Sequence, residues 1–364
     1  MSGARQRSLL VAIAVSAAVT LVSCGGGGNA GGSPTPAPVP SPTPSPSPTP
    51  SPSALTQSDA RIGECMNMGN MLEAPNEGDW GRPIVDGDFT DIKAMGFATV
   101  RLPVRFSNHA LTTPPYTIDG AFMDRVEHVV DTARAAGLRV ILDLHHYEDR
   151  QGNLFADPAA QKARFAALWQ QIGTRFKDKD GQVWFELVNE PHGSLDDTNL
   201  LSVLQPALDE VRKTNPTRPV VIGGQGYSGI ASLATLQLPN DPYLVVTFHY
   251  YDPFEFTHQG ATWITNPPPF GRAFPIGTDL ADLDANVRKA TNFMTSAKRP
   301  LFLGEYGAWE GIAVDQRATY YKAVHDAFKG ANIDGCVWAY TNTFPFRDSS
   351  TNSWIGQLLT AVGL

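Results

Sequence analysis

The sequence lacks features that would tie it to nucleic acid or to a membrane span. Its net charge of −8 at pH 7 provides no positive excess for nucleic acid or for an anionic membrane surface. The apolar run at residues 9–22 is too short and too rich in small residues for a spanning helix. The hydrophobic content of 42% is ordinary for a soluble globular protein.

The N-terminus predicts export. Arg5 and Arg7 precede the apolar run, and a basic start followed by such a run is typical of a signal peptide, here residues 1–23. The letters LVSCG at residues 21–25 resemble a bacterial lipobox. That resemblance implies cleavage before Cys24 and a lipid on its sulfur, which anchors a protein without spanning the membrane. The alternative is an ordinary signal peptide with a chance cysteine, which would give an extracellular protein.

Residues 24–54 form a segment of a different composition. Glycine comes first, and then proline alternates with serine and threonine. Such a segment has nothing to bury, so we expect a disordered, extended and semi-rigid linker. It could hold a domain away from a membrane, or it could be a tolerated connection without a role.

The segment 55–364, about 310 residues, suits one α/β domain. Strand-like runs alternate with helical ones, which predicts a parallel sheet with crossover helices and a single (β/α)8 TIM barrel. The expected strands are 62–68, 99–104, 139–147, 183–188, 219–224, 243–251, 301–303 and 335–340. The expected helices are 88–95, 121–136, 159–176, 200–214, 279–297, 314–330 and 354–362.

The stretch VWFELVNEPH at residues 183–192 begins as a buried strand and ends in polar residues. Pro191 cannot donate to a sheet ladder, so Asn189 and Glu190 should lie at the carboxyl end of the strand, where barrel active sites are found. Glu186 is on the same face but roughly 13 Å away. Paired sugar-cleaving carboxylates are about 5–9.5 Å apart, so Glu186 is expected to be a structural acid paired with an arginine.

A second carboxylate comes from LFLGEYGAW at residues 301–309. Residues 301–303 have the pattern of a buried strand, and Glu305 follows between Gly304 and Gly307. Glycine at these positions allows close approach of the backbone. The alternative is a solvent-exposed glutamate at a strand end.

The segments VNEPH and GEYGAW together resemble the retaining β-glycosidases of glycoside hydrolase family five. The resemblance runs from about residue 61 to the C-terminus. Positions that the family usually holds fixed have counterparts here, namely Arg101, His145, Asn189, Glu190, His249, Tyr251, Glu305 and Trp338.

The resemblance implies that Glu190 is the acid/base and Glu305 the nucleophile of a double displacement. Asn189 would bond the 2-hydroxyl of the sugar, and Arg101 and Tyr251 would stabilise the ionised Glu305. In the family the histidine at position 249 lies close to the acid/base. From the residues alone, Arg101 could also pair with Glu186, and the HYY motif at residues 249–251 could be packing.

The remaining expected site residues would contact the substrate. His145 matches the substrate-contacting histidine of the family, and His146 should face the opposite way because the two are neighbours in a strand. Trp338 would form the floor of the subsite for the reacting sugar, and aromatic rings suit flat sugar faces; the other tryptophans assigned to substrate binding are Trp80, Trp263 and Trp309. No further ligands for a metal are apparent near the histidines, so we expect neither metal nor cofactor.

Cys65 and Cys336 are placed near the starts of the first and last strands, which adjoin in a closed barrel. Export would permit a disulfide between them, although direct cross-strand geometry is awkward.

Three functions remain open. The loop after residue 251 resembles family members that act on β-1,4-glucans, which favours a monomeric endo-β-1,4-glucanase (a cellulase) acting on cellulose-like or mixed-linkage chains. The same chemistry on mannan, xyloglucan or β-1,3-glucan is the second. The third is a surface lipoprotein that binds glycan without cleaving it, which would not need both carboxylates.

Overall fold

The structure is a computed structural model that describes residues 53–149 and 152–364. The expected signal peptide, Cys24 and all but the last two residues of the expected linker lie outside the described residues. Within the described ranges, no helix combines the length and the apolar character that a membrane crossing requires.

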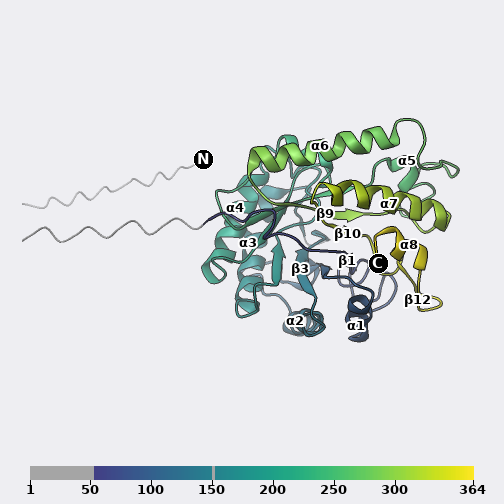
Figure 1. The fold of residues 1–364 in the computed structure, drawn as a ribbon. Coiled ribbons are helices and arrows are strands. Elements are labelled where there is room, and N and C mark those ends of the chain that lie inside the picture. Colours follow the sequence, from purple (N-terminus) through teal and green to yellow (C-terminus); the bar gives the residue numbers. More distant parts are fainter. Residues whose placement is uncertain (1–52, 150–151) are drawn as a thin grey trace, which may run out of the picture. The chain divides into compact units, whose positions relative to one another are not determined.

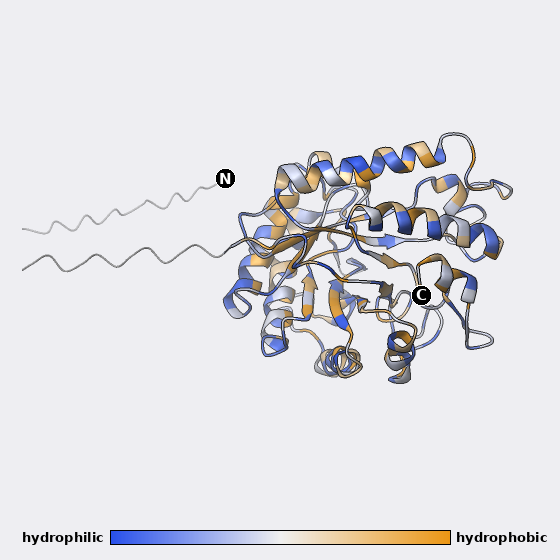
Figure 2. Ribbon diagram, in the orientation of Figure 1, coloured by the Kyte–Doolittle hydropathy of each residue, from blue (hydrophilic) through white to orange (hydrophobic). Residues whose placement is uncertain are grey.

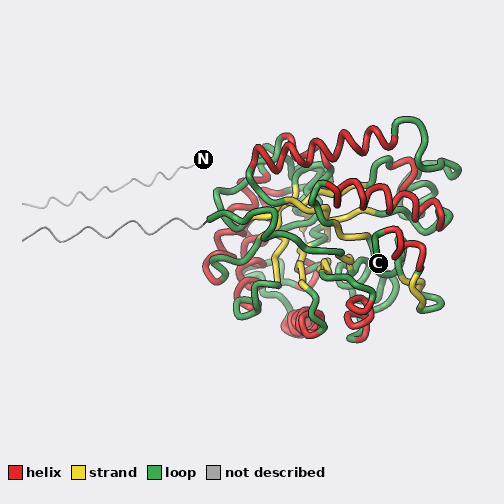
Figure 3. Tube along the Cα trace, in the orientation of Figure 1, coloured by secondary structure: helices red, strands yellow, loops and turns green. Residues whose placement is uncertain are grey.

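Parallel strands close into a barrel in the order β1-β10-β9-β8-β7-β6-β3-β2 (Figures 1 and 3). The sequence prediction of a (β/α)8 barrel is confirmed. The barrel strands are β1 (Cys65–Asn67), β2 (Thr99–Val104), β3 (Arg139–Leu144), β6 (Val183–Glu186), β7 (Val220–Gly223), β8 (Leu244–Tyr250), β9 (Leu301–Tyr306) and β10 (Gly335–Val337). The helices are α1 (Gly87–Ala94), α2 (Gly120–Ala135), α3 (Pro158–Arg175), α4 (Leu200–Thr214), α5 (Phe254–Thr257), α6 (Asp279–Ala297), α7 (Val314–Gly330) and α8 (Gly356–Ala361).

Two hydrophobic cores hold the barrel together. The larger one lies between the strands and the surrounding helices, whose inner faces are apolar (Figure 2). The smaller one consists of strand residues that alternate with those of the first, Cys65, Ile141, Trp184, Val221, Val245, Phe302 and Cys336, together with Ala60 and Ile62, which precede β1. Alternation of this kind is what a strand buried on both faces requires.

Cys65 and Cys336 belong to the smaller core and form a disulfide. They are direct partners in the register between β1 and β10, with Cα atoms 4.1 Å apart. The bond therefore joins the first and last strands of the barrel.

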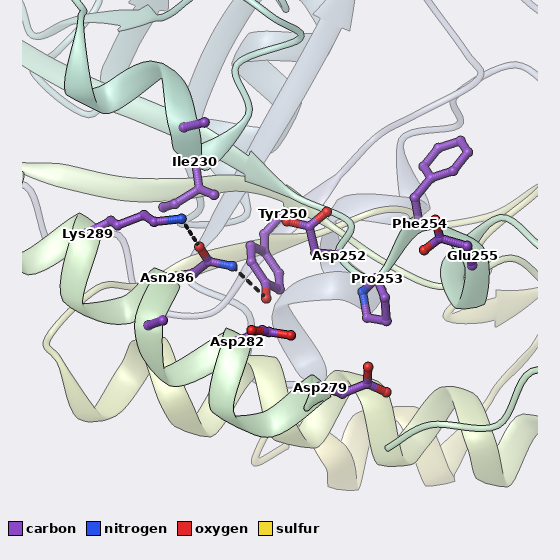
Figure 4. A pocket seen from close by; sticks show the side chains of 12 residues that line it. Ile230, Tyr250, Asp252, Pro253, Phe254, Glu255, Asp279, Asp282, Asn286 and Lys289 are labelled. Atoms are coloured by element: carbon purple, nitrogen blue, oxygen red, sulfur yellow. Dashed lines mark hydrogen bonds between the residues drawn. The ribbon is translucent and has the colours of Figure 1, made fainter. Parts of the chain in front are cut away.

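The expected elements differ from the structure mainly at their ends and after β7. Several strands are shorter than expected, and the described chain between β7 and β8 contains only the 3-10 helix η2 (Ile230–Ala234) where other strands have a full helix. A cavity of about 470 Å³ lies between η2 and α6 (Figure 4). In it, Lys289 donates to Asn286 at 2.8 Å, and Asn286 donates to the Tyr250 hydroxyl at 3.3 Å.

Besides η2 and the four-residue helix α5, further short elements were not expected from the sequence. The 3-10 helix η1 (Phe106–His109) follows β2. Two small hairpins, β4 (Glu148–Asp149) with β5 (Gly152–Asn153) and β11 (Arg347–Asp348) with β12 (Ser353–Trp354), lie outside the barrel sheet.

Candidate active site

Glu190 and Glu305 meet at the carboxyl ends of the barrel strands. Glu190 follows β6, and Glu305 lies in β9 opposite His249 of β8. One carboxylate oxygen of Glu190, one of Glu305 and a ring nitrogen of His249 all lie within 4.8 Å of one another. That spacing of the two carboxylates is close to the 5–5.5 Å of retaining glycosidases and below the 6.5–9.5 Å of inverting ones.

Arg101 is fully buried under this pair and organises it. Its guanidinium donates to Glu305 Oε1 at 2.7 Å and to both oxygens of Glu186 at 2.7 and 2.8 Å. It also donates to Asn189 Oδ1 at 2.8 Å. A buried guanidinium needs such partners, and each carboxylate in turn needs the cation. Both contacts considered for Arg101 from the sequence are therefore present.

The two catalytic candidates have different hydrogen-bond partners. Glu305 accepts from Arg101 and, through Oε2, from the Tyr251 hydroxyl at 2.9 Å. Glu190 Oε1 lies 2.8 Å from His249 Nδ1, and a quarter of its side chain is exposed.

Burial raises the pKa of both carboxyls. The pKa of Glu190 rises to about 7 because its burial outweighs the favourable charge of Arg101. Burial also raises the pKa of Glu305 to about 7, against the lowering effects of His249, Arg101 and the Tyr251 hydrogen bond. Since two fixed donors serve Glu305, a single negative charge shared by the pair is best placed on Glu305, with the proton on Glu190.

Glycines allow the close packing that this arrangement requires. A Cβ at Gly304 would lie 2.9 Å from His249 Nε2, and a Cβ at Gly69 would lie 2.7 Å from the Trp338 ring. Both distances are too short for any side chain, so only glycine lets His249 and Trp338 occupy their positions.

A second chain of contacts orients Asn189. Asp143 Oδ2 lies 2.6 Å from His145 Nδ1, and His145 Nε2 lies 3.3 Å from Asn189 Nδ2. Asn189 Oδ1 already accepts from Arg101, so its amide group is fixed at both ends. Burial and the neighbouring Arg101 hold the pKa of His145 well below its usual value, which leaves Nε2 free to accept.

The expectation that His145 and His146 face opposite ways is wrong. β3 ends at Leu144, so the alternation of a strand does not continue through the two histidines. Their rings lie edge to face with centroids 4.7 Å apart, and Trp80 lies edge to face on His146 at 5.6 Å.

The expected tryptophans follow different strands of the barrel. The Trp338 ring stacks parallel to His145 at 5.5 Å, and Trp263 lies edge to face with Trp309 at 5.9 Å. Phe270, which was not assigned to the site, stacks on Trp309 at 5.5 Å and is 60% exposed. Phe270 belongs to the loop after residue 251, and nothing in the sequence indicates its contact with Trp309.

Sequence reasoning also missed a group beside Glu190. His192 lies between the rings of Phe155 and Tyr227, with centroids 4.2 and 4.4 Å from its own. The only signal was the position of His192, two residues after Glu190.

In the part of the chain that the structure describes, a metal ion would find three ligands only at the catalytic carboxylates. Among the described residues, Glu190, His249 and Glu305 are the one set of three side chains close enough to share an ion. The catalytic role of a carboxylate pair already accounts for the short distance between Glu190 and Glu305. The expectation that the protein needs neither metal nor cofactor stays a prediction.

A (β/α)8 barrel with two glutamates at this separation, one held by a buried arginine and a tyrosine, has the architecture of a glycoside hydrolase. The family model described as Cellulase (glycosyl hydrolase family 5) matches residues 63–344. The chain belongs to this family.

Known proteins agree with this assignment. Endoglucanase H of Acetivibrio thermocellus is 38% identical, in a match that covers 83% of this chain and 33% of that protein. The chain thus spans about a third of the length of the first curated relatives it matches. The endoglucanase Cel5A of Thermotoga maritima is 37% identical with a TM-score of 0.79, covering 83% of this chain and 97% of that one. Cellulose synthase subunit Z of Clostridioides difficile is 30% identical with a TM-score of 0.79, covering 83% and 100%.

Proposed function

We propose that the protein is a retaining endo-β-1,4-glucanase that cleaves internal bonds of cellulose-like or mixed-linkage glucans. The observation that carries the proposal is the pair Glu190 and Glu305, with oxygens within 4.8 Å and with different hydrogen-bond partners. Family membership supports the reaction class.

In the first step, the ionised Glu305 attacks the anomeric carbon and forms a glycosyl-enzyme. Glu190, protonated because its pKa is raised to about 7, donates its proton to the leaving oxygen. Arg101 and Tyr251 hold Glu305 in line and keep its charge. Asn189, fixed by Arg101 and His145, has one amide hydrogen left for the sugar 2-hydroxyl.

In the second step, Glu190 is a carboxylate and acts as the base. It takes a proton from a water molecule, which attacks the anomeric carbon and releases Glu305. Two inversions at the same carbon give net retention. The short distance between the carboxylates suits this sequence because no water has to fit between them in the first step.

The polysaccharide chain would lie across the loops that carry exposed aromatic residues. Trp80, Trp263 and Phe270 are each at least 40% exposed and present ring faces or edges to solvent. The alternative substrate, mannan, has a specific observation in its favour: Thermotoga maritima Cel5A has been solved in complex with cellobiose and in complex with mannotriose.

The test compares Glu305→Gln with Glu310→Gln, an exposed glutamate five residues further on. On carboxymethyl cellulose, the unchanged protein and Glu310→Gln should lower viscosity and release reducing ends. Glu305→Gln should lose at least about 10³-fold in rate but still bind cello-oligosaccharides. An unchanged rate in Glu305→Gln refutes the mechanism, and binding without turnover in the unchanged protein favours the non-catalytic alternative.

Mannan, xyloglucan and mixed-linkage glucan are assayed in parallel. Activity on mannan alone would keep the catalytic assignments and overturn the assignment to β-1,4-glucan.

Export and anchoring are also proposed, from the sequence of residues 1–25 alone. In a bacterial host, labelled palmitate should be incorporated into the chain and lost in Cys24→Ser. Incorporation that persists in that variant, or none in the unchanged chain, would contradict the anchor.

A further inference from the structure

Both ring nitrogens of His192 face hydrogen-bond acceptors. Nδ1 lies 2.7 Å from the backbone carbonyl oxygen of Glu190, and Nε2 lies 2.8 Å from Glu148 Oε1. A carbonyl oxygen can only accept a hydrogen bond, and the same holds for an ionised carboxylate. Each nitrogen therefore carries a hydrogen, and the ring is an imidazolium cation.

Two aromatic rings fix the plane of this cation. Phe155 stacks on one face at an interplanar angle of 19°, and Tyr227 on the other at 12°. Aromatic faces attract cations, so the stack favours the charged ring. The Tyr227 N–H also donates to the Pro191 carbonyl at 3.0 Å, which ties the same short segment to the loop after β7.

The group that His192 holds is conformationally unusual. Glu190 has a φ of +47°, in the left-handed region. For a residue other than glycine this conformation is strained, and it persists where the surroundings enforce it. The conformation determines where the Glu190 side chain leaves the backbone, and hence its position against His249 and Glu305.

We propose that His192 is a positioning residue that acts as an imidazolium, clamping the carbonyl of Glu190 so that its backbone stays left-handed. Glu148, from the hairpin after β3, holds the other nitrogen and keeps the ring charged. The catalytic consequence rests on the function proposed for Glu190, whereas the charge state of His192 does not.

The other charged and titratable groups around the ring agree with this assignment. Burial disfavours the charged ring, but Glu148 and the Glu190 carbonyl raise the pKa of His192 above its ordinary value. His146 is close enough to Glu148 and His192 to interact with their charges, but burial holds its pKa well below the ordinary value, so it is neutral at neutral pH. Arg105 lies near Glu148 and favours its ionised form. The ring is fully charged at low pH, and it loses its charge and one of its two hydrogens as the pH rises through the raised pKa of His192.

Substitutions that keep one donor at a time separate the two contacts. Asparagine can place an N–H where Nδ1 lies, and glutamine can place one where Nε2 lies. We expect His192→Asn to keep kcat within about 3-fold, and His192→Gln and His192→Ala to lose about 10–100-fold, with KM within about 2-fold in all three. His128→Asn, an exposed histidine bonded to Asp86, is the matched control. Equal kcat values for the asparagine and glutamine variants, or an alanine variant as active as the unchanged protein, overturn the proposal.

The charge state is tested without catalysis. In the unchanged protein with ¹⁵N-labelled histidine, both ring nitrogens of His192 should show protonated shifts, with a titration midpoint above that of an ordinary histidine. Glu148→Gln should lower that midpoint. A neutral tautomer, or a midpoint that ignores Glu148, refutes the assignment even if the protein folds and cleaves glucan. Conversely, a protein without glycosidase activity that shows this titration would refute only the proposed function.

Discussion

Removing the disulfide between Cys65 and Cys336 should lower stability strongly. The bond joins residues 271 apart in the sequence and so constrains most of the domain in the unfolded state. The loop-entropy relation gives about 5.6 kcal/mol at 25 °C for a loop of this length, and real disulfides deliver up to about 5 kcal/mol. We expect a loss of about 3–5 kcal/mol in the free energy of unfolding.

The measurement is guanidinium unfolding of the unchanged protein, oxidised and reduced, beside Cys65→Ala/Cys336→Ala. Alanine is chosen because the sulfurs lie among apolar side chains, where a serine hydroxyl would be left without a partner. Cys24→Ser is the control, because it removes the third cysteine and leaves the pair intact.

Reduced protein and the double alanine variant should unfold at the same lower denaturant concentration. Oxidised and reduced protein that unfold within about 0.5 kcal/mol of each other would refute the argument, because the cross-link would then constrain nothing.

Three further predictions follow from the site and its support. Tyr251→Phe removes a hydrogen-bond donor that lowers the pKa of Glu305. The acid limb of the pH profile of kcat/KM should therefore move to higher pH, and kcat should fall about 10–100-fold. An acid limb that does not move would contradict the assigned contact. Burial would raise the pKa of Asp334, but hydrogen bonds from Arg61 and Lys329 lower this pKa to about 2. The ionised carboxylate therefore contributes fully to the stability of the fold above pH 3.8, the value for the unfolded chain, and this contribution is lost as the pH falls through 2. Asp334→Asn should therefore cost about 1–2 kcal/mol at pH 7, allowing for screening at the exposed Arg61, and a difference that persists at pH 2 in urea unfolding would argue against it. Trp263→Ala should raise KM for polymer several-fold and leave short aryl-glycosides unaffected; equal effects on both would place Trp263 outside the polymer-binding surface.

The sequence was sufficient for the barrel and for the pair of glutamates. Strands buried on both faces have long apolar runs, and polar residues that end such runs lie at the carboxyl edge of a parallel sheet. Pro191 marked that edge for Glu190, and the distance along the strand excluded Glu186 as its partner. Arg101 could be recognised because a cation inside an apolar strand must have a buried partner.

Contacts between loops could not be predicted from the sequence. Glu148 reaches His192 from β4, which begins four residues after β3 ends, and strand periodicity says nothing about the chain beyond the end of β3. The predicted orientation of His146 was wrong for the same reason, because His146 lies beyond the end of β3. Phe270 and Trp309 meet because two loops fold toward each other, and neither has a local signal for the other.

The disulfide has a consequence beyond thermodynamic stability. Because Cys65 and Cys336 lie in the first and last strands, the chain between them is a covalent ring. A protease that cuts one peptide bond in any loop of that ring leaves a single molecule, whose two pieces cannot diffuse apart. Damage at one exposed loop would then be tolerated by an oxidised molecule and would separate the pieces of a reduced one once it unfolds.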